Sequence, residues 1–166
     1  MNASRKAVTF WSIAIAITVL DFITKQLAEA SLQRGQPVEV LGDVLRFTLG
    51  YNTGIAFGLS LGGASRWLLV GVTLLTMGLI FWLFRSVDAR HKLQIIAFGL
   101  IMGGASGNLL DRIFGDYGVI DFIDVGVGAT RFWTFNIADS GITIGAILLI
   151  ISSFFEHKDT NVKGTA

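Results

Sequence analysis

Hydrophobic residues of this chain concentrate in four long runs. The runs span about residues 8–27, 67–84, 93–110 and 139–155. The second and third runs contain no charged residue, the fourth has none after Asp139, and the first carries Asp21 and Lys25 near its end. A membrane-spanning helix requires about 20 predominantly apolar residues. The pattern therefore predicts an α-helical membrane protein with four transmembrane helices.

The segments between these runs have a different pattern. Residues 36–60 alternate between apolar and polar positions, which is typical of a β-strand with one buried face. Residues 113–135 mix turn residues with short apolar runs. We expect a small β-structure between the first and second spans, lying on one side of the membrane. Residues 1–166 then form a single integral membrane domain.

Basic residues are distributed unevenly over the polar segments. Three short segments, 1–7, 85–92 and 156–166, carry seven Lys and Arg residues, whereas the longer segments 28–65 and 111–138 carry four. Short loops rich in Lys and Arg remain in the cytoplasm. We therefore predict that both termini are cytoplasmic and that both long connections face the outer side.

Composition narrows the possible functions. Apolar residues make up 52% of the chain and charged residues 15%, which excludes a disordered protein. The net charge of +1 and the lack of a basic cluster argue against nucleic-acid binding. The chain has no cysteine, so a disulfide framework, a thiol nucleophile and a thiolate metal site are excluded.

Acidic residues gather near the predicted outer interface. With a helix rise of about 1.5 Å per residue, Asp21, Asp111 and Asp139 lie at a similar level in three different helices. A carboxylate within a bilayer is costly unless it is paired, protonated or hydrated. Lys25 is placed to pair with Asp21 at i,i+4, and Arg112 adjoins Asp111, so those two acids have a structural explanation. Asp139 has no basic residue within a helical turn and is the stronger functional candidate.

A pair of aspartates is the type of catalytic site that remains once histidine-dependent sites are considered. Both histidines, His91 and His157, lie on the predicted cytoplasmic side, so a histidine-based zinc site or a Ser–His mechanism is not expected. Two carboxylates that share a site hold one proton between them, and together they can activate water and protonate a carbonyl. The residues alone leave Asp121, Asp111 and Asp124 open as the partner of Asp139.

Small and amide residues add two further expectations. Five glycines recur every four residues on the third and fourth runs and are expected to let the helices pack closely: Gly99, Gly103, Gly107, Gly141 and Gly145. Three asparagines, Asn52, Asn108 and Asn136, lie near the outer rim beside a glycine or an acid. Their amides can bind a substrate backbone or orient a carboxylate.

Five motifs together resemble a known family. In chain order they are DFITK from Asp21, YNTGIAFG from Tyr51, GGASGNLLDR from Gly103, VIDFID from Val119 and FNIADSGI from Phe135. Each is weak alone, but in this order and spacing they resemble the bacterial prolipoprotein signal peptidase, or signal peptidase II, over nearly the whole chain.

The resemblance implies an aspartyl endopeptidase of the bacterial inner membrane. Such an enzyme removes the signal peptide just before a diacylglyceryl-modified cysteine, with its active site near the outer face, and it requires no cofactor or metal. The implied catalytic pair is Asp121 and Asp139. The residues implied to bind substrate are Asn52, Gly54, Asn108, Arg112 and Asn136, and those implied to support the site are Asp21, Lys25 and Asp111.

The same resemblance implies lipidated prolipoproteins and membrane lipid as partners, and the cyclic peptide globomycin as an active-site inhibitor. We expect a monomer, and we assign no role to Asp124. Two other functions are compatible with membrane acids: a small ion or proton translocator, and a non-catalytic assembly or lipid-binding protein. A translocator requires acids along the whole path through the membrane, whereas the inner halves of these runs have none.

Overall fold

The computed structural model describes residues 2–53 and 63–163, with side chains for residues 2–53 and 66–154. Its helices are α1 (Ala3–Ser31), α2 (Gly63–Ser86), α3 (Lys92–Phe114) and α4 (Ile137–Lys163). Within the described residues, four helices are long and apolar enough to cross a membrane, as the sequence predicts. Each helix extends beyond its predicted span at both ends.

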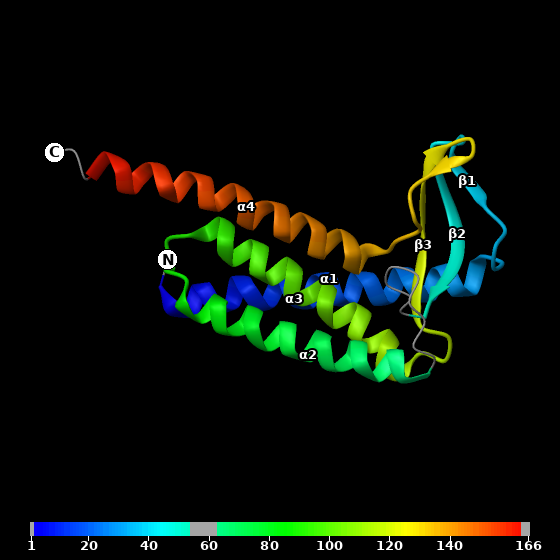
Figure 1. Ribbon diagram of the computed structural model, residues 1–166, viewed down its shortest axis with the longest axis horizontal. Helices are drawn as coiled ribbons and strands as arrows, with labels where there is room; N and C mark the ends of the chain where they lie inside the picture. The colour runs from blue at the N-terminus through cyan, green and yellow to red at the C-terminus, as the bar shows by residue number, and fades with distance from the viewer. Residues whose placement is uncertain (1, 54–62, 164–166) are drawn as a thin grey trace.

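The helices run side by side, and a sheet lies across one end of them (Figure 1). Both termini lie at the other end, which we call the terminal end; the end with the sheet is the sheet end. This arrangement confirms that the two long connections share one side of the bundle and the termini share the other.

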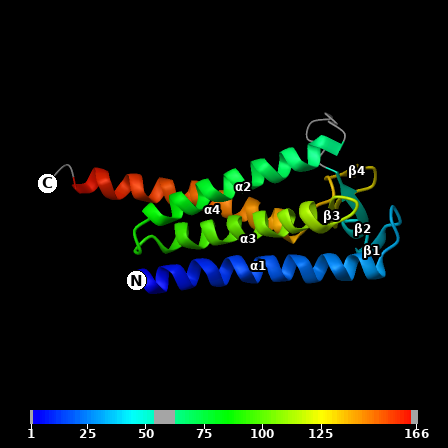
Figure 2. The ribbon, with the colours of Figure 1, turned by 90° about the horizontal axis from the view of Figure 1, so that it is seen from below.

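Helix α3 is the central element of the bundle. Its membrane-spanning window is 61% buried, against 11–22% for the windows of the other three helices. Figure 2 shows α3 running beside α1. A Cβ atom on Gly103 would lie 2.6 Å from the Ala14 carbonyl oxygen of α1, and one on Gly145 of α4 would lie 2.7 Å from the Ala97 carbonyl oxygen of α3. The predicted packing role of the glycines is confirmed at these two positions.

A cluster of buried apolar residues lies toward the terminal end. Phe10 of α1 stacks on Phe84 of α2 with ring centroids 4.0 Å apart, and Ile95 and Phe98 of α3 complete the cluster. Lys6 donates to the carbonyl oxygen of Val87 at 2.6 Å, just beyond the end of α2. These contacts fix the three helices relative to one another away from the sheet.

The sheet has four strands in the order β1 (Val38–Leu41), β2 (Leu45–Asn52), β3 (Val119–Val127) and β4 (Thr130–Arg131). All neighbouring strands are antiparallel. The predicted β-structure between the first two spans is therefore confirmed, except that residues 54–60 lie outside the described residues. Placing it only between those spans was incomplete, because β3 and β4 come from the segment between α3 and α4: β3 is the second hydrogen-bonded neighbour of β2, and β4 pairs with β3.

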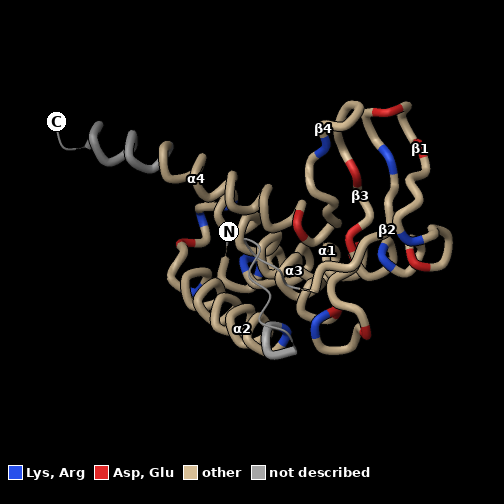
Figure 3. Tube along the Cα trace, turned by 45° about the vertical axis from the view of Figure 1, so that its right-hand side comes forward, with Lys and Arg blue, Asp and Glu red and all other residues tan. Residues whose placement is uncertain are grey.

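Basic and acidic residues both occur along the strands of the sheet (Figure 3). In the apolar stretches of the helices the only charged residues are Asp21 and Lys25, which are buried, and Asp139 at the start of its stretch, so the charged and the apolar surfaces are separated along the molecule. Exposed apolar side chains cover the helices, including Ile15 on α1, Leu75 on α2 and Ile150 on α4. This separation is the one that a protein crossing a bilayer requires.

Candidate active site

A tight turn brings strand β3 back from the end of α3. The Gly115 amide donates to the carbonyl oxygen of Asp111 at 2.8 Å, at the end of the helix. Gly118 has a φ of 108°, and a Cβ atom there would lie 2.5 Å from the Asn52 carbonyl oxygen, so this turn requires glycine. The Asp111 carboxylate then accepts from the Ile120 amide at 3.1 Å. The residue after Ile120, Asp121, is thereby fixed relative to α3.

The segment before α4 folds back onto the same strand. Phe135 and Ile123 exchange two backbone hydrogen bonds, of 2.8 and 3.0 Å, which places Asn136 near Asp121. Asn136 then caps α4: its side-chain oxygen accepts from the Asp139 amide at 2.9 Å, while the Asp139 carboxylate accepts from the Asn136 amide at 3.3 Å. This reciprocal pair resembles a capping box. It fixes Asp139 in the first turn of α4, where the helix dipole favours negative charge.

Two buried amides join the two aspartates. The Asn136 side chain donates to Asp121 Oδ1 at 2.7 Å, and the Asn108 side chain donates to Asp139 Oδ1 at 2.8 Å. Asn136 also donates to Asn108 Oδ1 at 3.1 Å, which links the two amides to each other. The structure thus connects Asp121 and Asp139 through two side chains, and both amides are at least 95% buried.

A buried lysine supports this cluster from α1. Lys25 Nζ lies 2.7 Å from Asp21 Oδ2, 2.8 Å from Asp111 Oδ2 and 3.0 Å from Asn108 Oδ1. Asp21 in turn accepts from the Ala138 amide at 2.8 Å, so α1 contacts the start of α4 as well. The predicted Asp21–Lys25 pair is present. The partner of Asp111 is this lysine rather than the adjacent arginine, because neighbouring residues on a helix point about 100° apart.

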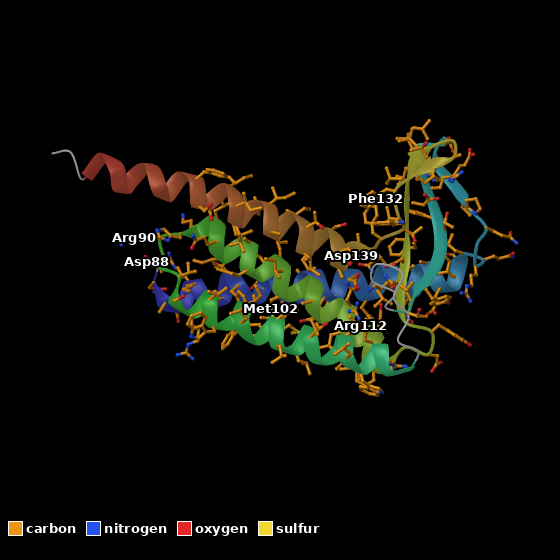
Figure 4. The ribbon with its side chains drawn as sticks, in the orientation of Figure 1. Asp88, Arg90, Met102, Arg112, Phe132 and Asp139 are labelled. Carbon is orange, nitrogen blue, oxygen red and sulfur yellow. The ribbon has the colours of Figure 1, made fainter. Side chains whose placement is uncertain are left out.

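Arg112 lies at the edge of the cluster. Its guanidinium donates to the Asn108 carbonyl oxygen at 3.1 Å and is within electrostatic range of Asp139, Asp111 and Asp121. Figure 4 shows Asp139 at the start of α4 and Arg112 near the end of α3, both toward the sheet end. This half-buried cation offsets part of the negative charge of the three nearby acids.

The surroundings of Asp121 favour its protonated form. Burial raises its pKa, and the negative charge of Asp139 raises it further, to about 7. Lys25 and hydrogen bonds from Asn136 and Asn52 act in the opposite direction but are outweighed. Asp139 is half-buried rather than buried. The two carboxyl groups therefore differ in their environments, which is the condition for an acid and a base at one site.

Of the two remaining residues implied to bind substrate, the structure describes one. Asn52 ends β2, pairs with Val119 and hydrogen-bonds the Asp121 side chain. Gly54 lies outside the described residues. No group of three or more His, Cys, Asp or Glu side chains in residues 2–53 and 66–154 is arranged to hold a metal ion.

Asp124, which had no predicted role, belongs to a separate cluster. It is three residues after Asp121 on β3, so the two side chains point to opposite faces of the sheet. Arg131 donates to it at 2.5 Å, Thr48 at 3.0 Å and Arg46 at 3.3 Å. Burial raises the pKa of Asp124, but these hydrogen bonds outweigh it and lower the pKa below its usual value. Asp124 therefore ties three strands together as an ionised group.

Comparison with known proteins identifies the family. The model of the family signal peptidase (SPase) II matches residues 13–155. The chain belongs to the signal peptidase II family. It is therefore an aspartic-type signal peptidase and a multi-pass bacterial membrane protein, as its motifs and hydrophobic pattern predict.

Proteins named lipoprotein signal peptidase are similar over most of the chain. The one from Hydrogenovibrio crunogenus is 42% identical and covers 92% of this chain and 88% of its own. Those from Francisella tularensis subsp. novicida and Geobacillus thermodenitrificans are 36% and 38% identical, covering 95% and 90% of this chain and 99% and 92% of their own.

Two solved structures of bacterial membrane enzymes share the fold. One superposes with a TM-score of 0.81 at 30% identity and covers 91% of this chain and 90% of its own. The other has a TM-score of 0.79 at 31% identity, with coverages of 87% and 91%. The four-helix architecture with its small sheet is thus that of known membrane enzymes.

Proposed function

We propose that this chain cleaves lipidated prolipoproteins just before the diacylglyceryl-modified cysteine, with Asp121 and Asp139 as the catalytic pair. The observation that carries this proposal is the pair itself. One carboxyl group is buried with a pKa near 7, the other is half-buried, and two linked amides hold both of them. Family membership supports the substrate class.

The proposed reaction divides acid and base between the two groups. Ionised Asp139 takes a proton from a water molecule as the water oxygen attacks the scissile carbonyl carbon. Protonated Asp121 gives its proton to the carbonyl oxygen, which forms a neutral tetrahedral intermediate. As the C–N bond breaks, Asp139 passes its proton to the departing amine and Asp121 recovers its own from the new carboxyl group. The cycle ends with both groups restored.

Asn108 and Asn136 are proposed to hold the catalytic pair as well as to line the substrate pocket. Their side-chain N–H groups already donate to the two aspartates, so in this structure they orient carboxylates. Arg112 is proposed to meet the substrate at the edge of the site, and Asn52 and Gly54 to contact the extended peptide beside β2. The catalytic pair is proposed to be supported through Asn108 by the cluster of Asp21, Lys25 and Asp111.

The membrane arrangement fits a lipid-anchored substrate. We propose that the sheet end faces outward from the bacterial inner membrane, because seven basic residues lie in the segments of the terminal end. Trp67, at the start of α2, and Trp133, beside β4, are 63% and 86% exposed, and tryptophan favours the membrane interface. The substrate's acyl chains would then stay in the bilayer while its peptide reaches Asp121.

We further propose that the chain acts as a monomer and that globomycin competes for the same site. The ion-translocator alternative is disfavoured by the distribution of acids. In α1, α3 and α4 they lie toward the sheet end of the membrane-spanning stretches, and the corresponding stretch of α2 has none. A translocation path would need them at intervals across the bilayer.

Cleavage of a synthetic diacylglyceryl-modified signal peptide by the purified chain in detergent tests the proposal. Asp121→Asn and Asp139→Asn should each lower the rate by about 10²–10⁴-fold, because each removes one proton-transfer group. Asp88→Asn is the matched control, since Asp88 lies between α2 and α3 at the terminal end. Normal cleavage by either site variant would refute the assignment.

A further inference from the structure

A cavity lies beside the candidate active site, between α1, α3 and the turn that leads into β3. Its volume is about 380 Å³. Glu29 of α1 and Asp116 of the turn line it, and Asp111 forms the wall that it shares with the Lys25 cluster. None of the described residues that line it is Lys or Arg. The catalytic pair of the proposed function is not part of this lining.

Charge and backbone direction both favour a cation in this cavity. Phe22, Gln26 and Glu29 come from the last third of α1, and Leu110 and Phe114 from the last turns of α3. The C-terminal end of a helix carries partial negative charge, so two helix ends add to the carboxylates. Tyr51 donates to Glu29 at 2.9 Å and orients that carboxylate without neutralising it.

The shape of the aromatic wall distinguishes between kinds of cation. The rings of Tyr51 and Tyr117 lie 5.3 Å apart between centroids at 55°, in contact with each other. They leave no room between them for a quaternary ammonium, which aromatic cages enclose. A primary ammonium has three N–H donors that carboxylates can accept, so it suits this lining better.

An apolar groove continues from the cavity into the membrane-spanning region. A second hollow of about 350 Å³ lies between α1 and α3, and Leu110 lines both it and the cavity. Along α1 the lining residues recur every three or four positions on one face: Trp11, Ile15, Val19, Phe22, Gln26 and Glu29. Apart from Thr18 and Ser106, the residues that line its deep part are apolar, whereas polar residues line its mouth.

The length of the groove matches one leaflet of a bilayer. Trp11 and Phe22 are 11 positions apart, or about 16 Å along the helix. Half of a hydrocarbon core of about 30 Å is about 15 Å. An acyl chain that begins near Phe22 would therefore extend along the groove past the middle of the predicted span 8–27 and end near Trp11.

Arg34 completes the set of groups needed for a zwitterionic headgroup. Its guanidinium carbon lies 5.4 Å from the centroid of the Tyr51 ring, so it adds positive charge next to the acidic cavity. The carboxylates of the cavity would then neutralise the ammonium of a headgroup, and the Arg34 guanidinium would neutralise its phosphate. We infer that the cavity and groove bind one phospholipid with a primary-amine headgroup, of the ethanolamine type, with one acyl chain between α1 and α3.

Native mass spectrometry of the detergent-purified chain tests this inference. It is titrated with phosphatidylethanolamine, phosphatidylcholine and phosphatidylglycerol of identical acyl chains. We expect one bound phosphatidylethanolamine, held at least about tenfold more tightly than either other lipid. Equal affinity for phosphatidylethanolamine and phosphatidylcholine would overturn the inference.

Variants separate the headgroup site from the groove. The double variant Glu29→Gln and Asp116→Asn keeps the side-chain shapes and should weaken phosphatidylethanolamine binding about tenfold, whereas Glu39→Gln on β1 should not. Val19→Trp should block the groove, while Leu75→Trp, on the exposed surface of α2, should not. Unchanged lipid affinity in both site variants would refute the assignment. Because the readout is lipid binding, the result stands apart from any result on peptide cleavage.

Discussion

At the residue scale, one buried lysine holds the acids around the candidate site. Lys25 is 1% exposed and contacts Asp21, Asp111 and Asn108, which together accept its three N–H groups. A buried ammonium is tolerated only when it is paired and hydrogen-bonded in this way. Asn108 in turn donates to Asp139, so this lysine contacts a residue that holds the proposed catalytic pair.

Removal of Lys25 tests that role. Lys25→Met leaves two carboxylates without their shared cation and should lower the free energy of unfolding by about 3–5 kcal/mol. Thermal unfolding in detergent measures the loss, with Lys92→Met at the exposed start of α3 as the control. Equal unfolding midpoints for the two variants would contradict the proposed role.

The pH profile of cleavage tests the proton on Asp121. Because its pKa is raised to about 7, the group is protonated below that pH and loses its proton above it. The rate should therefore fall as the pH rises through about 7. Asn52→Ala removes a hydrogen bond that lowers this pKa, so it should move the falling limb to higher pH. A falling limb that stays in place in that variant would count against protonated Asp121 as the acid.

At the scale of elements, different faces of α3 pack against α1 and α4. Gly103 admits the backbone of α1, and Gly104, one position later, lies against Ala138 of α4. Thr18 of α1 also donates to the Gly103 carbonyl oxygen at 3.1 Å. Close approach of α1 and α4 to α3 is what lets Lys25 and Asp139 reach the same asparagine.

Two glycine substitutions measure this packing. Gly103→Ala places a Cβ atom 2.6 Å from the Ala14 carbonyl oxygen and should destabilise the protein by about 1–3 kcal/mol. Gly78→Ala on α2 meets nothing within 4 Å and should be neutral or stabilising by up to about 1 kcal/mol. Thermal unfolding of the pair in one detergent makes the comparison, and similar midpoints would show that α1 and α3 tolerate separation.

The elements differed in how well the sequence predicted them. Each helix was predictable because its apolar run has the length of a bilayer crossing. Strand β3 was not predicted, because Val119–Phe122 are all buried and give no alternation of apolar and polar positions. The pairing of Asp121 with Asp139 could not be derived from residue spacing. Helix rise gives the depth of a residue in the membrane but not the direction in which its side chain points. The strand register and the turn after α3 supply that direction.

At the scale of the whole molecule, the sheet and the bundle meet where the candidate site lies. The end of β2, the start of β3 and the ends of α1 and α3 converge with the first turn of α4 at this junction. The cluster of Asp124, Arg46 and Arg131 stiffens the sheet farther along its strands. The helices thus fix how deep the site lies along the bundle, and the sheet fixes the direction in which its side chains point.

The order of these elements along the chain has a consequence for biosynthesis. Asp139 lies in the first turn of α4, so both members of the proposed catalytic pair come together only after the ribosome has made the first three helices and the start of α4. Until α3 arrives, the lysine in α1 has Asp21, one turn away, as its counter-ion. That internal pair lets the first helix enter the membrane with its charge already neutralised. The emerging chain therefore carries no assembled peptidase site while its first three helices are being inserted.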